Sequence, residues 1–204
     1  MDLFNSEITA NKLPYDGEVN YYGPILSLKE SQELFEVLVD EIAWQKDSSI
    51  MFGKLIVTDR KMAFYAKDKL SYTYAHIERH TLPFTDHLLR LKELVEKKTG
   101  EKFNSCLLNL YYSGKEGMGW HTDDEKELHE SGAIASLSLG AERNFVFKHK
   151  ETKQRISMIL QRGSLLVMKG STQKNWLHSL PKTTKVNSPR INLTFRMMHN
   201  IKNV

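Results

Sequence analysis

The chain has a single cysteine, Cys106, in 204 residues, so no disulfide can form within it. The absence of disulfides fits a reducing compartment. The N-terminus has neither the basic start nor the continuous apolar run of a signal peptide, and no stretch is long and apolar enough to span a membrane. These absences exclude a disulfide-rich scaffold. They predict a soluble, intracellular protein without a membrane partner, in the cytoplasm or, in a eukaryote, the nucleus.

No tract of low complexity is present, and the composition is that of an ordinary globular protein, with 40% hydrophobic and 26% charged residues. The length suits one domain, or one domain with an N-terminal extension. A formal net charge of +4 and a pI of about 9.0 permit a polyanionic partner without establishing one.

Two helices are expected in the first half of the chain. Residues 1–24 contain several proline and glycine breakers and are expected to form an irregular N-terminal extension. Ser27 begins a helix that runs to about residue 44, because Glu30 follows three positions later and completes a capping box. A second helix is expected over residues 85–98, where leucines recur at helical spacing.

The pattern changes after residue 100, where short apolar runs alternate with glycine, asparagine, serine and lysine. These runs are SCLLNLYY, AIASLSLG, NFVFKHK, RISMILQ, GSLLVMK and INLTFRMM. Many short strands with turn signals indicate a sandwich or a small barrel. The predicted class is therefore α+β, with N-terminal helices packed against an antiparallel β core.

The stretch WHTDDE places His121 two residues before Asp123. In an extended segment, both side chains lie on one face and can reach one metal ion. His178, in NWLHSLP, can supply a third ligand. Two histidines and one carboxylate form the facial triad of non-haem Fe(II) oxygenases. Each residue alone has an ordinary interpretation, as part of a solvated turn or a packed strand, so the prediction depends on their conjunction.

The stretch RINLTFR divides into two faces. Arg190, Asn192, Thr194 and Arg196 share one face, and Ile191, Leu193 and Phe195 share the other. Such a polar face usually lies in water. Here, however, two arginines flank an asparagine and a threonine without any acidic residue, which suits a dianion such as a dicarboxylate.

Four stretches together resemble the AlkB family of 2-oxoglutarate- and Fe(II)-dependent dioxygenases, which remove alkyl groups from nucleic-acid bases. They are NLYYSGKEGMGWHTDDE, SLSLGAERNFVFKHK, GSLLVMKGSTQKNWLHSLPK and PRINLTFR. The resemblance covers about residues 50–198 and implies a double-stranded β-helix, or jelly roll, with helices outside. The dioxygenase domain would then span residues 25–204, with helices and a nucleotide-recognition lid in 25–100 and the catalytic jelly roll in 101–198.

The resemblance also implies roles for individual residues. Fe(II) would be held by His121, Asp123 and His178. The far carboxylate of the cosubstrate 2-oxoglutarate would meet Arg190, helped by Tyr111 and Asn192. Asn109 and Arg196 would lie near its chelating end, with Thr194 on the same wall.

The substrate base would be held by residues of the lid and of the acidic segment after the first metal ligand. The resemblance implies that Tyr74 stacks on the base and that Tyr72 hydrogen-bonds nearby, although alternating tyrosines also commonly cover a core. Asp124 and Glu125 would accept a hydrogen bond from the exocyclic amino group of the base.

Two further positions are expected to contact the nucleic acid. Phe52 resembles the apolar wedge with which some members enter the base stack, although a buried phenylalanine is an equally good interpretation. Arg60 and the lysines around it are expected at phosphates.

The implied reaction is oxidative demethylation of bases such as 1-methyladenine and 3-methylcytosine in DNA, with RNA possible, releasing formaldehyde and succinate in alkylation repair. Alternatives are the same oxygenase chemistry on RNA, a protein or a small molecule, a non-catalytic nucleic-acid-binding barrel, and a zinc hydrolase, which would not need the arginine face. The hairpin KHKETKQRISM is short and leaves less room for a long basic loop that reaches the opposite strand of a duplex, which argues against a preference for double strands. We expect a monomer.

Overall fold

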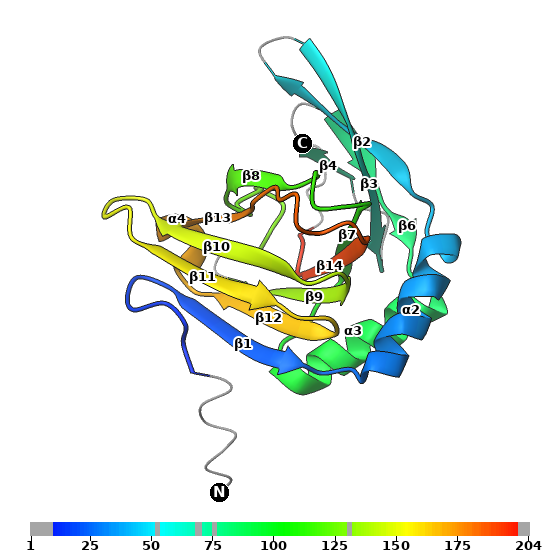
Figure 1. Ribbon diagram of the computed structural model, residues 1–204, viewed down its shortest axis with the longest axis horizontal. Helices are drawn as coiled ribbons and strands as arrows, with labels where there is room; N and C mark the ends of the chain where they lie inside the picture. Colours follow the sequence, from blue (N-terminus) through cyan, green and yellow to red (C-terminus); the bar gives the residue numbers. More distant parts are fainter. Residues whose placement is uncertain (1–9, 52–53, 68–70, 75–76, 130–131, 200–204) are drawn as a thin grey trace, which may run out of the picture.

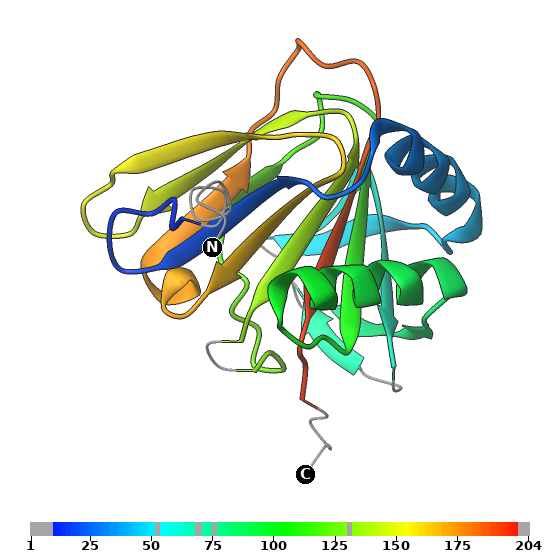
Figure 2. The same cartoon turned by 90° about the horizontal axis from the view of Figure 1, so that it is seen from below.

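The computed structural model describes residues 10–51, 54–67, 71–74, 77–129 and 132–199. For residues 48–51, 54–57, 71–74 and 77–79 it describes the backbone only. Two β-sheets face each other, and the helices pack on the outer side of the larger sheet (Figures 1 and 2).

The two long helices begin and end where capping residues occur in the sequence. Helix α2 spans Leu28–Glu41, and the side chains of Ser27 and Glu30 form the predicted capping box. Helix α3 spans Asp86–Thr99 and ends at Gly100, which adopts a left-handed conformation (φ 75°) that glycine tolerates best. A short helix, α4, spans Thr172–Asn175. None of the helices in the described part of the chain is long and apolar enough to cross a membrane.

The major sheet has eight strands in the order β1-β12-β9-β14-β7-β3-β2, with β6 beside β3. Their bounds are β1 Glu18–Pro24, β2 Gln45–Met51, β3 Lys54–Ala66, β6 Leu82–Pro83, β7 Ser105–Tyr111, β9 Ile134–Gly140, β12 Ser164–Lys169 and β14 Arg190–Arg196. All of these pairs are antiparallel except β3 with β6.

The minor sheet has four strands in the order β11-β10-β13-β8. Their bounds are β8 Met118–His121, β10 Arg143–His149, β11 Arg155–Leu160 and β13 Trp176–Leu180. A separate hairpin consists of β4, Ser71–Tyr74, and β5, Ile77–His80. Two facing antiparallel sheets with helices outside confirm the predicted jelly roll.

The central strands of the major sheet divide apolar from polar side chains. Leu108 of β7 and Leu193 of β14 point toward α2 and α3 and join a core with Leu38 and Leu88. Cys106 is buried in the same helix-side core, and burial raises the pKa of its thiol. The opposite face of the strands turns toward the minor sheet, where their polar side chains line a cavity.

A second apolar cluster joins the two sheets at the end away from the helices. Phe147 and Trp176 of the minor sheet pack there with Leu166 of the major sheet. His149 packs edge-on against both Tyr15 and Trp176, so the N-terminal segment is fixed to this end of the sandwich.

The expectation of irregular structure for all of residues 1–24 is wrong for residues 18–24, which form β1 on the edge of the major sheet. Val19 is fully buried there. The strand was missed because its apolar residues do not alternate cleanly, whereas its backbone is held by the neighbouring β12.

Packing of α2 against the sheet is expected to contribute strongly to stability. Leu38→Ala, at a fully buried position, should lower the free energy of unfolding by about 2–5 kcal/mol because it leaves a cavity. Val39→Ala, on the exposed side of the same helix, should change it by less than about 0.5 kcal/mol. Urea denaturation of both variants measures the difference, and equal losses would contradict the packing described.

Candidate active site

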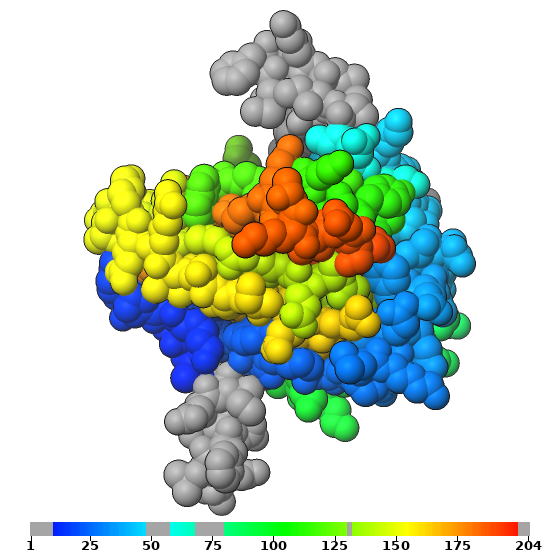
Figure 3. Space-filling view, in the orientation of Figure 1, coloured from blue at the N-terminus to red at the C-terminus, as the bar shows by residue number. Residues whose placement is uncertain are grey.

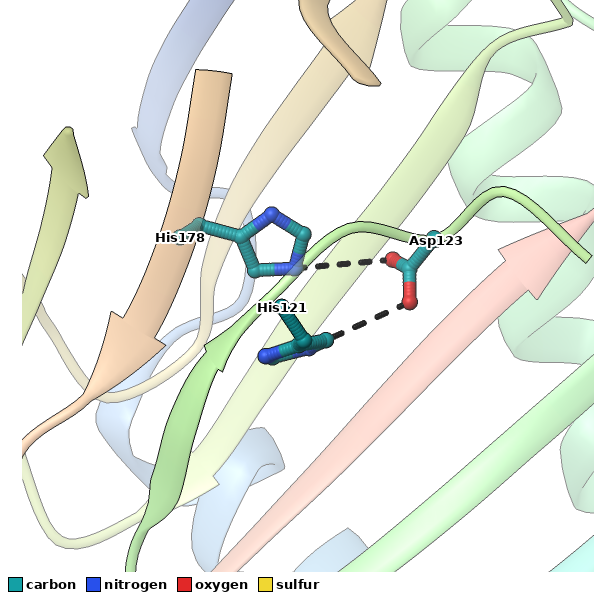
Figure 4. Close-up of side chains that lie close together, drawn as sticks. All are labelled: His121, Asp123 and His178. Atoms are coloured by element: carbon teal, nitrogen blue, oxygen red, sulfur yellow. Dashed lines mark ion pairs between the residues drawn. The ribbon is translucent and has the colours of Figure 1, made fainter. Parts of the chain in front are cut away.

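Pairing of β8 with β13 places His121 directly opposite His178. Their ring centroids lie 4.2 Å apart. Asp123 follows β8 and turns its carboxylate toward both rings, with 4.0 Å from Oδ1 to Nε2 of His121 and 3.7 Å from Oδ2 to Nε2 of His178 (Figure 4). The structure therefore brings together the three side chains that the sequence singled out as metal ligands.

Local hydrogen bonds and packing orient the two imidazoles. Nδ1 of His121 lies 2.8 Å from the carbonyl oxygen of Gly119, to which it must donate because a carbonyl only accepts. This leaves the lone pair of Nε2 free to bind a metal. The ring of His178 is buried against Phe145 and Phe147, at centroid distances of 5.5 and 6.1 Å.

The protonation states of the triad suit metal binding. Burial lowers the pKa of His178 to about 3, with Asp123 opposing this shift and His121 and Arg196 adding to it. Burial alone would raise the pKa of Asp123, but Arg196 and the two histidines lower it by more. At neutral pH, His178 is therefore a neutral imidazole and Asp123 a carboxylate, which are the forms that ligate metals.

Arg196 of β14 fixes the acidic segment after His121. Its Nη2 donates to Oδ1 of Asp123 at 2.9 Å, and its Nη1 donates to Oε1 of Glu125 at 3.0 Å. The backbone N–H of Asp123 donates to the side-chain oxygen of Gln173 at 2.9 Å. These contacts hold the carboxylate beside the histidines without occupying Oδ2.

Arg143, at the start of β10, connects the loop that precedes β8 to the end of β13 through hydrogen bonds. Its buried guanidinium donates to four backbone carbonyls, those of Ser113 at 3.2 Å, Gly114 at 3.5 Å, Glu116 at 2.8 Å and Pro181 at 2.9 Å. Gly117 lies so close to β13 that a Cβ atom would come within 2.4 Å of the Leu180 carbonyl oxygen. Arg143 and this close approach therefore set how β8 meets β13.

Arg190 lies at the other end of the cavity with only 2% of its surface exposed. Its Nη2 donates to the hydroxyl of Ser138 at 2.9 Å and to the side-chain oxygen of Asn192 at 3.0 Å. Burial lowers its pKa to about 10, an effect that Tyr111 opposes and Arg143 strengthens. Within the described ranges no ion pair joins Arg190 to a carboxylate, so a buried cation faces the cavity without an anion.

Polar side chains from β7 and β14 form the wall between Arg190 and the triad. Tyr111 has the guanidinium of Arg190 5.7 Å from its ring centroid. Asn192 donates to the hydroxyl of Thr194 at 2.7 Å and accepts from Ser136 at 2.7 Å. The predicted cosubstrate residues that line this one cavity are Asn109, Tyr111, Arg190, Asn192, Thr194 and Arg196. Three methionines, Met62, Met118 and Met168, line it as well.

Arg60 does not lie on an exposed rim, so the expectation that it meets phosphates is wrong. Only 7% of its surface is exposed, and its guanidinium forms an ion pair with Asp47. It also donates to the thioether of Met118 at 3.2 Å. Burial lowers the pKa of Arg60, but Tyr111 and Asp47 raise it by more, so it lies above its usual value. Sequence alone cannot distinguish such a buried, paired arginine from a surface one.

The structure describes only some of the predicted substrate residues, and these differ in whether they line the cavity. Glu125 lines the cavity, and while Arg196 binds its Oε1, its buried Oε2 has no hydrogen-bond partner among the described residues. Asp124 is exposed beside it. Tyr72 and Tyr74 belong to β4, of which only the backbone is described, and Phe52 lies outside the described residues.

Sequence reasoning missed three supporting residues, Arg143, Gln173 and Ser138. Each acts through a group that is distant along the chain, either a backbone carbonyl, a backbone N–H or the Arg190 side chain. The only signal for Arg143 was a charged residue at the start of the apolar strand NFVFKH. That signal did not indicate what the arginine contacts.

The donor set fits Fe(II). The ligand atoms of His121, Asp123 and His178 lie within 4.8 Å of one another, so one ion can touch all three. Two imidazoles and one carboxylate on one side of a metal leave positions open for a chelating cosubstrate and O₂. The unneutralised Arg190 in the same cavity matches the second carboxylate of such a cosubstrate.

Comparisons with known proteins agree with this chemistry. The 2OG-Fe(II) oxygenase superfamily matches residues 18–196. Alpha-ketoglutarate-dependent dioxygenase alkB homolog 3 from Bos taurus is 38% identical, over 85% of this chain and 64% of that protein. DNA oxidative demethylase ALKBH2 from Homo sapiens is 37% identical, over 86% of this chain and 71% of that protein. The chain thus spans less than two thirds of the bovine relative.

A solved structure, titled "The structure of OsALKBH1", matches with a TM-score of 0.61 and covers 91% of this chain and 99% of that chain. At 14% sequence identity, this likeness supports the fold alone. The superfamily match confirms Fe(II) and 2-oxoglutarate as the predicted cofactors. Together with the two close relatives, it shows that the chain belongs to the AlkB family of 2-oxoglutarate- and Fe(II)-dependent dioxygenases.

Proposed function

We propose that this protein is an oxidative demethylase of nucleic acids that removes N-methyl groups, such as those of 1-methyladenine and 3-methylcytosine, from DNA. The observation that carries the proposal is the His121–Asp123–His178 cluster in one cavity with the buried, unneutralised Arg190. Relatives named DNA oxidative demethylase, 37% identical over most of this chain, support DNA as the substrate.

In this proposal, Nε2 of both histidines and the carboxylate of Asp123 hold the iron. When bound, iron and 2-oxoglutarate use O₂ to oxidise the N-methyl carbon, so that formaldehyde and the unmodified base are released with succinate. The chain keeps Asp123 ionised through Arg196 and keeps His178 neutral through burial. It therefore presents the ligands in binding-ready form before the metal arrives.

The polar wall of the cavity binds and orients the cosubstrate. Arg190 meets its far carboxylate, with Tyr111 against the guanidinium and Asn192 hydrogen-bonded beside it. Asn109 and Arg196 lie toward the chelating end, and Thr194 continues the same wall. Because Arg190 is buried, the ion pair forms away from water, where its strength and its selection for a dianion are greatest.

The substrate base enters from the side of Glu125. The buried Oε2 of Glu125, which has no partner among the described residues, accepts a hydrogen bond from the exocyclic amino group of adenine or cytosine. Asp124 adds negative charge that favours a cationic methylated base. Tyr74 and Tyr72 of the β4–β5 hairpin cover the base, and Phe52 fills the gap that the extruded base leaves. These last three assignments rest on the family resemblance.

Mass spectrometry of a methylated oligonucleotide tests the activity directly. After incubation with Fe(II), 2-oxoglutarate and air, an oligonucleotide with one 1-methyladenine should lose the mass of one CH₂ group and yield one formaldehyde per methyl removed. Omission of 2-oxoglutarate is the control. Unchanged DNA and RNA oligonucleotides, with succinate still formed on addition of a protein or a small molecule, would overturn the proposed substrate class.

Asp123→Ala should abolish formation of succinate and formaldehyde, because the variant lacks one of three ligands and one of the two carboxylates that Arg196 binds. Asp124→Ala, the neighbouring exposed acid, is the matched comparison and should retain Fe(II) binding. Titration of Fe(II) into both variants, followed by visible absorption after anaerobic addition of 2-oxoglutarate, separates loss of metal from loss of turnover. Wild-type succinate production by Asp123→Ala would refute the ligand assignment.

Arg190→Ala should raise the KM for 2-oxoglutarate by about 30-fold or more, because a buried charge pair contributes at least about 2 kcal/mol. The KM for the oligonucleotide should change far less. Arg162→Ala, which removes an arginine on the turn before β12, controls for loss of positive charge. Steady-state kinetics with each substrate varied in turn measure both constants, and equal increases in the two would argue against the assigned role.

A further inference from the structure

An aromatic residue on β8 lies on the opposite side of the strand from the metal site. His121 points into the cavity, whereas its neighbour Trp120 keeps 38% of its surface exposed and does not line the cavity. Successive residues of a strand point to opposite faces. One short strand therefore carries a proposed iron ligand on its inner face and an exposed indole on its outer face.

Two cations approach this indole from the same side of the sheet, across β13. Nζ of Lys148 lies 4.4 Å from the centroid of the Trp120 ring, and Cζ of Arg155 lies 5.7 Å from it. Lys148 belongs to β10 and Arg155 to β11, next to each other in the minor sheet. Their neighbours Phe147 and Ile156 pack inward, so both cations stand on the outer face with Trp120. The hairpin that carries them forms one end of the surface in Figure 3, where it is coloured yellow.

The two cations are held together without an acid between them. Lys148 and Arg155 are directly opposite each other in the register of β10 and β11. Like charges in such a pair destabilise a sheet. In the part of the chain that the structure describes, no ion pair joins either residue to a carboxylate. The arrangement is therefore costly for the free protein and favours binding of an anion from outside.

An exposed aromatic ring beside two cations that have no acidic partner among the described residues matches single-stranded nucleic acid. Bases stack on such rings whatever their sequence, and the backbone phosphates meet the cations. In a duplex, each base is already stacked on its neighbours and paired, so its face is not available to a surface indole. The positive charge at this surface is complementary to the phosphates of the strand.

We propose that Trp120, Lys148 and Arg155 form a platform for an unpaired nucleotide that flanks the target base, so that the protein acts on single strands in preference to duplexes. The flanking base stacks on the indole, and Lys148 shifts from the ring to a phosphate. The target base enters the cavity on the other side of β8, beside His121. This proposal rests on the proposed function, since it places a neighbour of the reacting nucleotide.

Binding of an unmodified, fluorescein-labelled oligonucleotide tests the platform without relying on catalysis. By fluorescence anisotropy, Trp120→Ala should weaken binding of the single strand about 5- to 100-fold, the effect of losing one stacked base. Trp120→Phe should retain part of the affinity. Ile159→Ala, which removes a 50% exposed apolar residue from the same sheet face, is the matched control and should bind like the wild type. Circular dichroism confirms that each variant is folded.

The outcomes separate the platform from the proposed function. Wild-type affinity of Trp120→Ala for the single strand would overturn the platform, as would an equal loss of affinity for the duplex. Trp120-dependent binding without any demethylation would support the platform and refute the substrate assignment instead.

Salt dependence tests the two cations separately. The double variant Lys148→Gln/Arg155→Gln should reduce the slope of log Kd against log salt by roughly 0.7 for each lost phosphate contact. An unchanged slope would overturn the role of the cations. Steady-state kinetics test the role of the platform in catalysis. In Trp120→Ala, kcat/KM for a methylated oligonucleotide should fall relative to kcat/KM for the methylated mononucleotide, which has no flanking base to stack.

Discussion

The alternation of side chains along β14 is the constraint on which the site depends. Its apolar residues, such as Leu193, are anchored in the core beneath the two helices, and this forces Arg190 and Arg196 into the space between the sheets. A slip of one residue would exchange the two faces and place both guanidinium groups in the core. The cost of burying Arg196 is offset by Asp123 and Glu125, whereas the charge of Arg190 is left for a ligand.

The two sheets contribute different parts of the chemistry. The minor sheet supplies His121 and His178, while the major sheet supplies Arg190 and the polar wall around it. Arg196 links the two sheets, because it lies on the major sheet and donates a hydrogen bond to the carboxylate of Asp123, beside the two histidines of the minor sheet. The position of the Asp123 carboxylate therefore depends on the packing of the two sheets, which couples the arrangement of the proposed metal ligands to the tertiary structure.

Much of the fold and of the candidate site could be predicted from the sequence, for reasons that differ among the elements. The helices were predictable because Ser27, Glu30 and Gly100 are local capping signals. The triad was predictable from the conjunction of a short HxD spacing with a distant histidine and an arginine-bearing strand. The role of Arg143 was not predictable, because its acceptors are backbone carbonyls, which every residue type has and which no sequence pattern reveals. Arg60 was misplaced because a charge gives no sign of its own burial, and β1 was missed because its partner strand stabilises it.

The location of the sulfur atoms bears on how the proposed oxidation chemistry would affect the protein itself. The single thiol, Cys106, is on the helix side of the major sheet, whereas the cavity side presents thioethers, those of Met62, Met118 and Met168. Thiols oxidise stepwise, and beyond the reversible sulfenic acid they form sulfinic and sulfonic acids that cells rarely repair, but a methionine sulfoxide is returned to methionine by dedicated reductases. Oxidation at the cavity wall would therefore convert methionine to its sulfoxide, a change that can be reversed.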